Sequence, residues 1–523
     1  YNTRDIKFIL KEWLPTEEVL AYDKYRDYYS LDDLDTIIDQ VRKIAAEVIA
    51  PTAEDGDNIG ARWEDGKVYI PSSFHTAYRF IHDNGWGTSN LDDSSEGNLP
   101  LVLQPFLHEI IAAANPAFFA YVGAGSGVAN VLKHYANEEQ KKIFLPKLFD
   151  GSWSGTMCLT EPTSGSDVGD LLSKAYPTDK PGIYMLKGQK IFITCGDRDD
   201  VENIVHLYLA RIEGAAPGTK GLSLFIMPKY WVNEDGSLSD NDVILTGAEH
   251  KLGQHASVTA SLSFGDNDGC RGWLLGKNPL ENEGKGEGMA QMFQMMNLAR
   301  METGHMAHCC IANAFYNARD YAKDRIQGRP FTNPRGNRVP IIQHEDIKRT
   351  LLMGKAHMEA TRAMLMKALY YFDVREHDPD PETRQFAQLY VEVVTPLCKA
   401  YPSDEGWWLC GEAIQAYGGY GYCEEYPVAQ IARDIKIYSI WEGTNFIQSL
   451  DLVGRKMGMA KGAVFASFVK DMKDFYAKNQ NTAGLEKEFA KFGKALESFD
   501  GILKALLEWK GSNPAMIPVY SRR

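Results

Sequence analysis

The sequence predicts a mainly α-helical protein with a small antiparallel β domain in its middle, and three observations support this class. Apolar residues recur at helical spacing before about residue 150 and again after about residue 280. Between these regions, short apolar-rich runs are separated by Gly, Pro, Asn and Asp turns, as in β-strands. The charged segments near the C-terminus return to helical spacing. We therefore expect four regions: an N-terminal helical domain 1–150, a middle β domain 151–280, a helical bundle 281–455 and a helical extension 456–523.

The N-terminal region contains several expected helices. The run 31–49 is apolar at i, i+3, i+4 and i+7, and Pro51 should end it. The Gly-rich stretch 123–127 should separate two later helices. Asn137 and Gln140 have the spacing of a helix N-cap. The later helices are expected at 101–114, 128–135 and 138–149.

The middle and C-terminal regions show first a two-residue and then a helical period. Strands are expected at 152–159, 183–186, 204–209, 222–228 and 258–264. Four long helices in succession then suggest a bundle; they are expected at 289–325, 344–374, 381–400 and 404–416. Two further amphipathic helices are expected at 460–478 and 485–507, with no terminal helix after them.

Composition limits the function classes. The chain has 523 residues, of which 44% are hydrophobic and 24% charged, which is typical of a folded globular protein. A net charge of −14 without a basic arm argues against nucleic acid as the main ligand. Eight cysteines without a C-x-x-C pair predict reduced thiols and a cytoplasmic protein. No stretch of 18 apolar residues occurs, so we expect no membrane span.

Two motifs lie in the β region. The segment 157–167 runs from a strand into a turn rich in hydroxyls and backbone N–H groups, which can bind a planar ring or a phosphate. An ordinary turn between two domains fits the same residues. In the segment 187–194, Phe192 and Thr194 lie two residues apart and share a strand face. A half-buried structural strand explains that pattern equally well.

Two further motifs lie in the last part of the bundle. The segment 415–422 runs from a helix end into glycines that allow a ligand to approach the backbone, although a simple helix stop is also consistent. In the segment 433–448, Glu442 stands between Trp441 and Gly443 among apolar neighbours. Desolvation there would raise the pKa of the carboxyl toward that of a general base. The alternative is an exposed glutamate that caps a helix.

Two other chemistries have weaker support. His305, His308 and Cys309 have the spacing of ligands on one helix face, but no second cluster matches them, so we favour packing and predict no metal. The sequence lacks a Gly-x-Ser-x-Gly elbow, which argues against a serine nucleophile.

Taken together and in this order, the motifs resemble the acyl-CoA dehydrogenase family. Segments 158–167 and 415–448 look like its two signatures, and the resemblance covers roughly residues 30–455. Finer features at 203–225, 249–253 and 292–297 are similar to the long forms with an extra C-terminal region, a group that includes 3-methylmercaptopropionyl-CoA dehydrogenases.

The resemblance implies an FAD enzyme that converts an acyl-CoA thioester to a trans-2-enoyl-CoA and passes electrons to electron-transfer flavoprotein. Glu442 would take the α-proton. Some family members carry this base on the first bundle helix, where this chain has Ala299, and Glu302 is expected to point elsewhere because it lies two residues beyond Arg300. An acyl-CoA oxidase that uses O₂ and a non-catalytic acyl-CoA-binding protein are the alternatives.

The resemblance also assigns binding roles. FAD would contact a first group of residues near its ring, a second group from the neighbouring subunit of a homodimer, and a third group near the adenine. These groups are Met157, Leu159, Thr160, Ser166, Phe192 and Thr194; Arg325, Gln327, Gln415, Gly418 and Gly419; and Thr444 and Phe446. Acyl-CoA would contact Ser166, Arg300, Trp441 and Gly443. The extension would cover the face that short members use to form tetramers.

Overall fold

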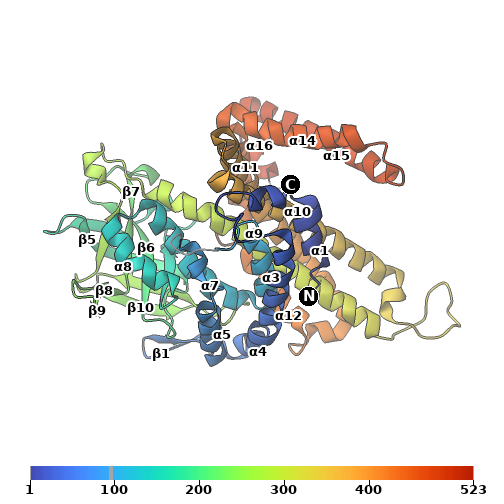
Figure 1. The fold of residues 1–523 in the computed structure, drawn as a ribbon, viewed down its shortest axis with the longest axis horizontal. Helices are drawn as coiled ribbons and strands as arrows, with labels where there is room; N and C mark the ends of the chain where they lie inside the picture. Colours follow the sequence, from blue (N-terminus) through green and yellow to red (C-terminus); the bar gives the residue numbers. More distant parts are fainter. Residues whose placement is uncertain (1, 93–97, 522–523) are drawn as a thin grey trace.

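The computed structural model describes residues 2–92 and 98–521. A β-sheet lies on one side of the molecule, long helices pack on the other, and the N-terminal helices fill the space beside both (Figure 1). This arrangement confirms the predicted class, mainly helical with a middle β domain.

The described residues of the N-terminal region, 2–92 and 98–150, are mainly helical, with two short strands between helices. Its helices are α1 (Arg4–Phe8), α2 (Thr16–Leu20), α3 (Leu31–Ile44), α4 (Pro51–Ile59), α5 (Ser72–Asp83), α6 (Gln104–Ala114), α7 (Pro116–Tyr135) and α8 (Glu138–Phe149). Its strands are β1 (Arg62–Glu64) and β2 (Lys67–Tyr69).

Two predicted boundaries in this region are wrong. Pro51 does not end the helical segment. A π-helical turn (Ala45–Ile49) precedes α4, and Pro51 is the first residue of α4, a position where the missing N–H of proline costs no hydrogen bond. The glycines of 123–127 do not break α7. Of these glycines, Gly127 serves close packing, since a Cβ there would lie 2.6 Å from the Met295 side chain, whereas a Cβ at Gly123 would meet no atom within 4 Å. The predicted N-cap at Asn137 is confirmed.

The sheet has eight strands in the order β10-β11-β5-β12-β7-β6-β3, with β4 paired to β5 and β6. Most pairs are antiparallel, but β3 and β4 each run parallel to β6, which the sequence did not predict. Its strands are β3 (Trp153–Cys158), β4 (Lys174–Pro177), β5 (Ile183–Thr194), β6 (Asn203–Ile212), β7 (Leu222–Pro228), β10 (Val243–Ala248), β11 (Thr259–Phe264) and β12 (Arg271–Leu275); β8 (Tyr230–Val232) and β9 (Leu238–Asp240) form a separate ribbon.

The bundle consists of α9 (Gly288–Asp324), α10 (Glu345–His377) and α11 (Pro381–Tyr417), followed by α12 (Pro427–Ile435) and α13 (Asn445–Gly454). The sequence predicts two helices, 381–400 and 404–416, where α11 is one, and Pro402 lies between the two predicted helices. Pro402 has no N–H for the carbonyl of Cys398. That carbonyl lies against Gly304 of α9, where a Cβ would be only 1.9 Å away, so the neighbouring helix accommodates the irregularity.

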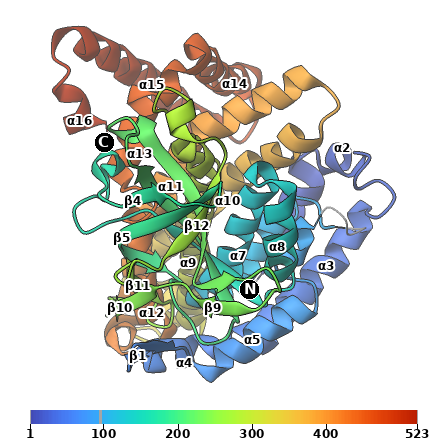
Figure 2. The ribbon, with the colours of Figure 1, turned by 90° about the vertical axis from the view of Figure 1, so that its left-hand side faces the viewer.

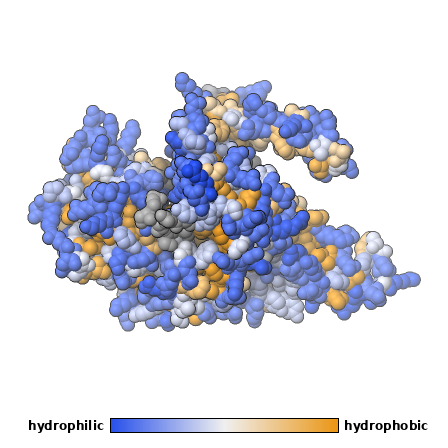
Figure 3. All heavy atoms as spheres, in the orientation of Figure 1, coloured by the Kyte–Doolittle hydropathy of each residue, from blue (hydrophilic) through white to orange (hydrophobic). Residues whose placement is uncertain are grey.

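The extension forms a helical hairpin of α14 (Ala463–Asn479) and α15 (Glu486–Ser512), followed by α16 (Met516–Tyr520), a terminal helix that the sequence did not predict. Figures 1 and 2 place the hairpin at one end of the molecule, beyond the bundle. Phe465 packs with Val393 of α11, and Phe475 contacts Phe489 of α15. Its visible face mixes apolar and hydrophilic residues (Figure 3). In the described part of the chain, no helix is long and apolar enough to span a membrane.

Candidate active site

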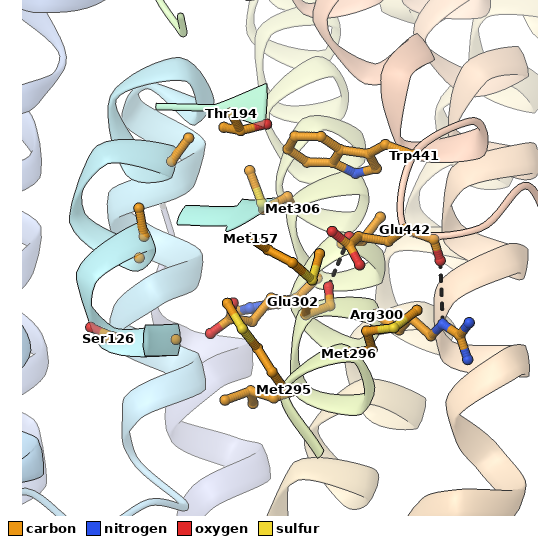
Figure 4. Close-up of a pocket in the computed structure, with 18 of the residues that line it drawn as sticks. Ser126, Met157, Thr194, Met295, Met296, Arg300, Glu302, Met306, Trp441 and Glu442 are labelled. Atoms are coloured by element: carbon orange, nitrogen blue, oxygen red, sulfur yellow. Dashed lines mark hydrogen bonds between the residues drawn. The ribbon is translucent and has the colours of Figure 1, made fainter. Parts of the chain in front are cut away.

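A cavity of about 1470 Å³ lies where the sheet, α6, α7, α9 and the turn before α13 meet. Figure 4 shows side chains that reach it from the sheet, from α9 and from this turn. Eleven of the residues predicted from the sequence line the cavity: Met157, Leu159, Thr160, Ser166, Phe192, Thr194, Arg300, Trp441, Glu442, Gly443 and Thr444. Signatures almost 300 residues apart in the chain are thus brought to one site.

Glu442 occupies a strained turn at the cavity wall. Its φ is +54° and that of Gly443 is +81°, so a non-glycine residue sits in the left-handed region, as occurs at functional sites. The carbonyl of Glu442 accepts hydrogen bonds from Nε of Arg300 at 3.3 Å and from Nε2 of Gln448 at 3.1 Å. These two bonds hold the turn in place.

The Glu442 carboxyl is buried, and its Oε2 atom has no hydrogen-bond partner in the described part of the chain. Burial raises the pKa of this carboxyl, while the positive charges of Arg300 and Lys399 act in the opposite direction. The predicted desolvation of Glu442 is therefore confirmed. Such a carboxylate is a stronger base than an exposed one.

Arg300 lines the cavity but is nearly fully buried. Its guanidinium also pairs with Asp451 of α13 at 3.4 Å, and Arg455 binds the same carboxylate. Arg300 thus connects α9 to α13 and supports the Glu442 turn from below.

A buried ion pair fixes the turn after β3. Lys190 of β5 lies 2.9 Å from the Glu161 carboxylate, which also accepts backbone N–H groups of Leu172 and Ser173. The carbonyl of Thr160 accepts the N–H of Ile191 at 2.9 Å. These contacts attach the signature turn to β5 and explain how Thr160 and Thr194 reach one cavity.

Phe192 presents an aromatic ring to this cavity. It has a φ of +58° and is 59% exposed, which is unusual for a phenylalanine within a strand. The register between β5 and β11 shifts beside it. Thr160 and Thr194 both line the cavity, and no hydrogen bond joins either hydroxyl to another described residue, so both are available to a ligand.

A second hollow of about 580 Å³ lies at the junction of α9, α10 and the end of α11. It collects the other predicted cofactor residues: Arg325, Gln327, Gln415, Gly418 and Gly419. It shares no lining residue with the first cavity. Phe446 lines neither of the two and is 37% exposed.

The prediction that Glu302 points elsewhere is wrong. Glu302 lines the same cavity as Glu442 (Figure 4), and Ala299 and Met306 of α9 line it as well. Two residues do separate Glu302 from Arg300 by about half a helical turn, but Ala299 lies three residues before Glu302 and therefore shares its face. The three-residue spacing between Ala299 and Glu302 would have predicted that Glu302 faces the cavity.

The histidines of α9 belong to a buried polar network. The His308 ring bonds Thr361 at 2.8 Å and lies 3.4 Å from Glu109, whose carboxylate pairs with Arg362. His305 stacks parallel to His308. Within residues 2–92 and 98–521, no group of three or more His, Cys, Asp or Glu side chains has the geometry of a metal site.

The chain matches family models along most of its length. Residues 32–152, 156–266 and 286–458 match the N-terminal, middle and C-terminal domains of acyl-CoA dehydrogenases. The chain belongs to the acyl-CoA dehydrogenase family. It is therefore an oxidoreductase, as the resemblance implies.

Relatives within the family agree over nearly the whole chain. A butyryl-CoA dehydrogenase of Syntrophomonas wolfei is 45% identical over 100% of this chain and 86% of its own length. A 3-methylmercaptopropionyl-CoA dehydrogenase of Ruegeria pomeroyi is 36% identical over 98% of this chain and 85% of its own length. The solved butyryl-CoA dehydrogenase of Megasphaera elsdenii is 25% identical with a TM-score of 0.64, covering 82% of this acyl-CoA dehydrogenase and 98% of that chain.

Proposed function

We propose that this protein uses FAD to oxidise the Cα–Cβ bond of an acyl-CoA thioester and passes the electrons to electron-transfer flavoprotein. One observation carries the proposal: the buried carboxyl of Glu442 faces the same cavity as the free hydroxyls of Thr160 and Thr194. A base and a cofactor surface therefore meet where the two reacting carbons of a substrate would lie.

The cavity residues fit an isoalloxazine ring. Phe192 offers an exposed aromatic face, and Met157, Leu159 and Thr160 border the same space. Ser166 and Thr194 add hydroxyls that can bind the acceptor atoms of the ring. When bound there, FAD supplies the acceptor for the β-hydride.

Glu442 has two tasks in this scheme. Its carboxylate takes the α-proton, and burial makes that carboxylate more basic. Its backbone N–H has no partner in the described part of the chain and is free to bind the thioester carbonyl. Such a bond stabilises the developing enolate by about 3–4 kcal/mol. Arg300 and Gln448 keep this N–H in place through the carbonyl of the same residue, and Trp441, Gly443 and Thr444 complete the wall.

The second hollow fits the adenosine and pyrophosphate part of FAD. Gly418 has a φ of +64°, and a Cβ on Gly418 or Gly419 would meet no atom within 4 Å, so the backbone there is open to a ligand. Arg325 lies at the same hollow and can pair with a phosphate, with Gln327 and Gln415 beside it. Because the two sites share no lining residue, we propose that FAD spans two subunits of a homodimer. Phe446, exposed and outside both sites, has the weakest support as an adenine contact.

The acyl group is proposed to be short and linear, because the relatives at nearly full length are named for butyryl-CoA and 3-methylmercaptopropionyl-CoA. A cytoplasmic location is proposed as well, since all eight cysteines are free.

The domain boundaries at residues 150, 280 and 455 stay predictions.

Turnover tests this function directly. The purified yellow protein is given linear, branched and aromatic acyl-CoAs, with electron-transfer flavoprotein or O₂ as acceptor. We expect enoyl-CoA formation from butyryl-CoA with the flavoprotein and slow reoxidation by O₂. Rapid turnover with O₂ alone would make the protein an oxidase, and a colourless protein without turnover would leave only an acyl-CoA-binding role.

A further inference from the structure

Glu302 is one of the carboxyls that line the cavity, and the proposed reaction does not use it. It lies on the α9 face that also presents Ala299 and Met306 to the cavity. Glu442 approaches this space from the turn before α13, so two glutamates from distant parts of the chain face one largely apolar chamber (Figure 4). Within the described part of the chain, no hydrogen bond contributes to the pKa of the Glu302 carboxyl.

The surroundings of Glu302 favour its neutral form. Burial raises the pKa of its carboxyl to about 7, and the charge of Glu442 contributes in the same direction. His305 on the same helix and His108 of α6 offer no compensating charge, since burial lowers the pKa of His305 to about 3 and that of His108 to about 4.

Two cations near Glu442 have partners of their own. Arg300 pairs with Asp451 and with the Glu442 carbonyl, and Lys399 of α11 bonds the Asn445 side chain. Both cations act on the pKa of Glu442, where they favour the ionised form. The two glutamates are thus unequal: the cations favour ionisation of Glu442, whereas no cation among the described residues contributes to the pKa of Glu302.

We propose that Glu302 is a proton-holding carboxyl of the acyl cavity: it stays neutral beside ionised Glu442, and above neutral pH an acyl-CoA binds only together with one proton on Glu302. The inference rests on the proposed binding of acyl-CoA. The physical basis is desolvation. The acyl chain displaces water from the cavity, which raises the free energy of having both Glu302 and Glu442 ionised. A neutral Glu302 spares the site a second negative charge while the enolate forms.

The sign of the pH effect follows from this exchange. Below the pKa of Glu302 the carboxyl already holds its proton, so binding takes up none. Above that pKa each binding event takes up one proton, and affinity falls up to tenfold for each further pH unit. Glu302→Gln holds no titratable proton, so it should show neither effect.

Calorimetry on the FAD-containing protein measures this uptake. Butenoyl-CoA, the product form of the proposed substrate, is titrated at pH 6 and pH 8 in buffers of different ionisation enthalpy. We expect uptake of about one proton at pH 8 and almost none at pH 6, and none at either pH in Glu302→Gln. Glu376→Gln removes an exposed carboxylate from the rim of the same cavity and should keep the uptake. Uptake that persists in Glu302→Gln, or is missing from the wild type, would overturn the proposal.

Infrared titration of the ligand-free holoenzyme gives an independent readout. A protonated-carboxyl band with a midpoint near pH 7 is expected in the wild type and is expected to be missing from Glu302→Gln. The signals of Asp373 and Asp434, whose pKa values burial raises to about 6, should stay in both proteins. Glu302→Asp should retain a band that titrates near pH 7. Lack of the band in the wild type at pH 6 would contradict the inference whether or not acyl-CoA binds. If the band is present and no acyl-CoA binds, the proposed function fails instead.

Discussion

Two buried glutamates in this protein have opposite pKa shifts, and the difference separates a structural from a chemical role. Burial acts to raise the pKa of Glu161, but Lys190 and two backbone N–H groups hold it below the ordinary value. Glu442 has no such direct partner, so burial dominates and its pKa rises. Full pairing makes Glu161 part of the framework, whereas incomplete pairing leaves Glu442 able to accept a proton.

Substituting Lys190 tests the framework role. In Lys190→Met the Glu161 carboxylate stays buried without its cation, so stability should fall by about 3–5 kcal/mol. Urea denaturation of the holoenzyme measures the change. Lys180→Met removes the cation of an exposed pair with Glu234 and should change stability by no more than about 1 kcal/mol. Equal stabilities of the two variants would contradict the assignment.

At the scale of elements, the spacing of apolar residues in the sequence predicted most helices and strands, and the errors have identifiable causes. Pro402 lies at the break predicted between helices 381–400 and 404–416, but packing on α9 keeps α11 continuous. The strands predicted at 183–186 and 187–194 form one strand, β5, because β11 and β12 pair with it on either side of the Gly188 region. Such outcomes depend on partners distant in sequence, which a local pattern does not contain.

The candidate site was predictable as far as its motifs were local. The signature turn 157–167 and the segment Trp441–Glu442–Gly443 were identified from their residue types alone, and the structure brings them to one cavity. Glu302 was missed because its role depends on which face of α9 meets the cavity. The support of Glu442 by Arg300 and Gln448 likewise needs the tertiary structure.

The loop before β11 tests the packing between the β domain and α12. A Cβ on Gly253 would lie 2.6 Å from the carbonyl carbon of Arg433 and 2.7 Å from the nitrogen of Asp434. Gly253→Ala should therefore cost about 1–3 kcal/mol, because backbone atoms cannot move aside easily. Gly247→Ala in β10 meets no atom within 4 Å and is the matched control. Thermal unfolding compares the two, and a Gly253→Ala protein as stable as the control would refute the contact.

At the scale of the whole molecule, the shared FAD site predicts a link between cofactor and assembly. Arg325 lies at the second hollow with its guanidinium over the ring of Tyr420. Arg325→Ala loses a strong contact to pyrophosphate, so we expect a protein with little FAD and a weaker oligomer. Absorbance and light scattering measure both. A monomeric variant that retains full FAD would exclude the shared site.

The extension should determine the oligomeric state. Its hairpin covers apolar side chains of α11, among them Val393 and Tyr390, which contacts Phe468. Truncation after Arg455 would expose them, and exposed apolar patches drive association. We expect the full-length protein to be a dimer and the truncated one to form tetramers or aggregates in light scattering. A full-length tetramer would rule out this role.

Anaerobic flavin reduction in Glu442→Gln tests the central claim, that Glu442 is the α-base. Glutamine keeps the size and hydrogen bonding of the side chain but cannot take a proton, and general bases contribute roughly 10²–10⁴-fold to rate. With butyryl-CoA in a stopped-flow cell, flavin bleaching should slow by at least about 10²-fold, while the FAD content and visible spectrum stay unchanged. Bleaching at nearly the wild-type rate would contradict the account and place the base on another residue.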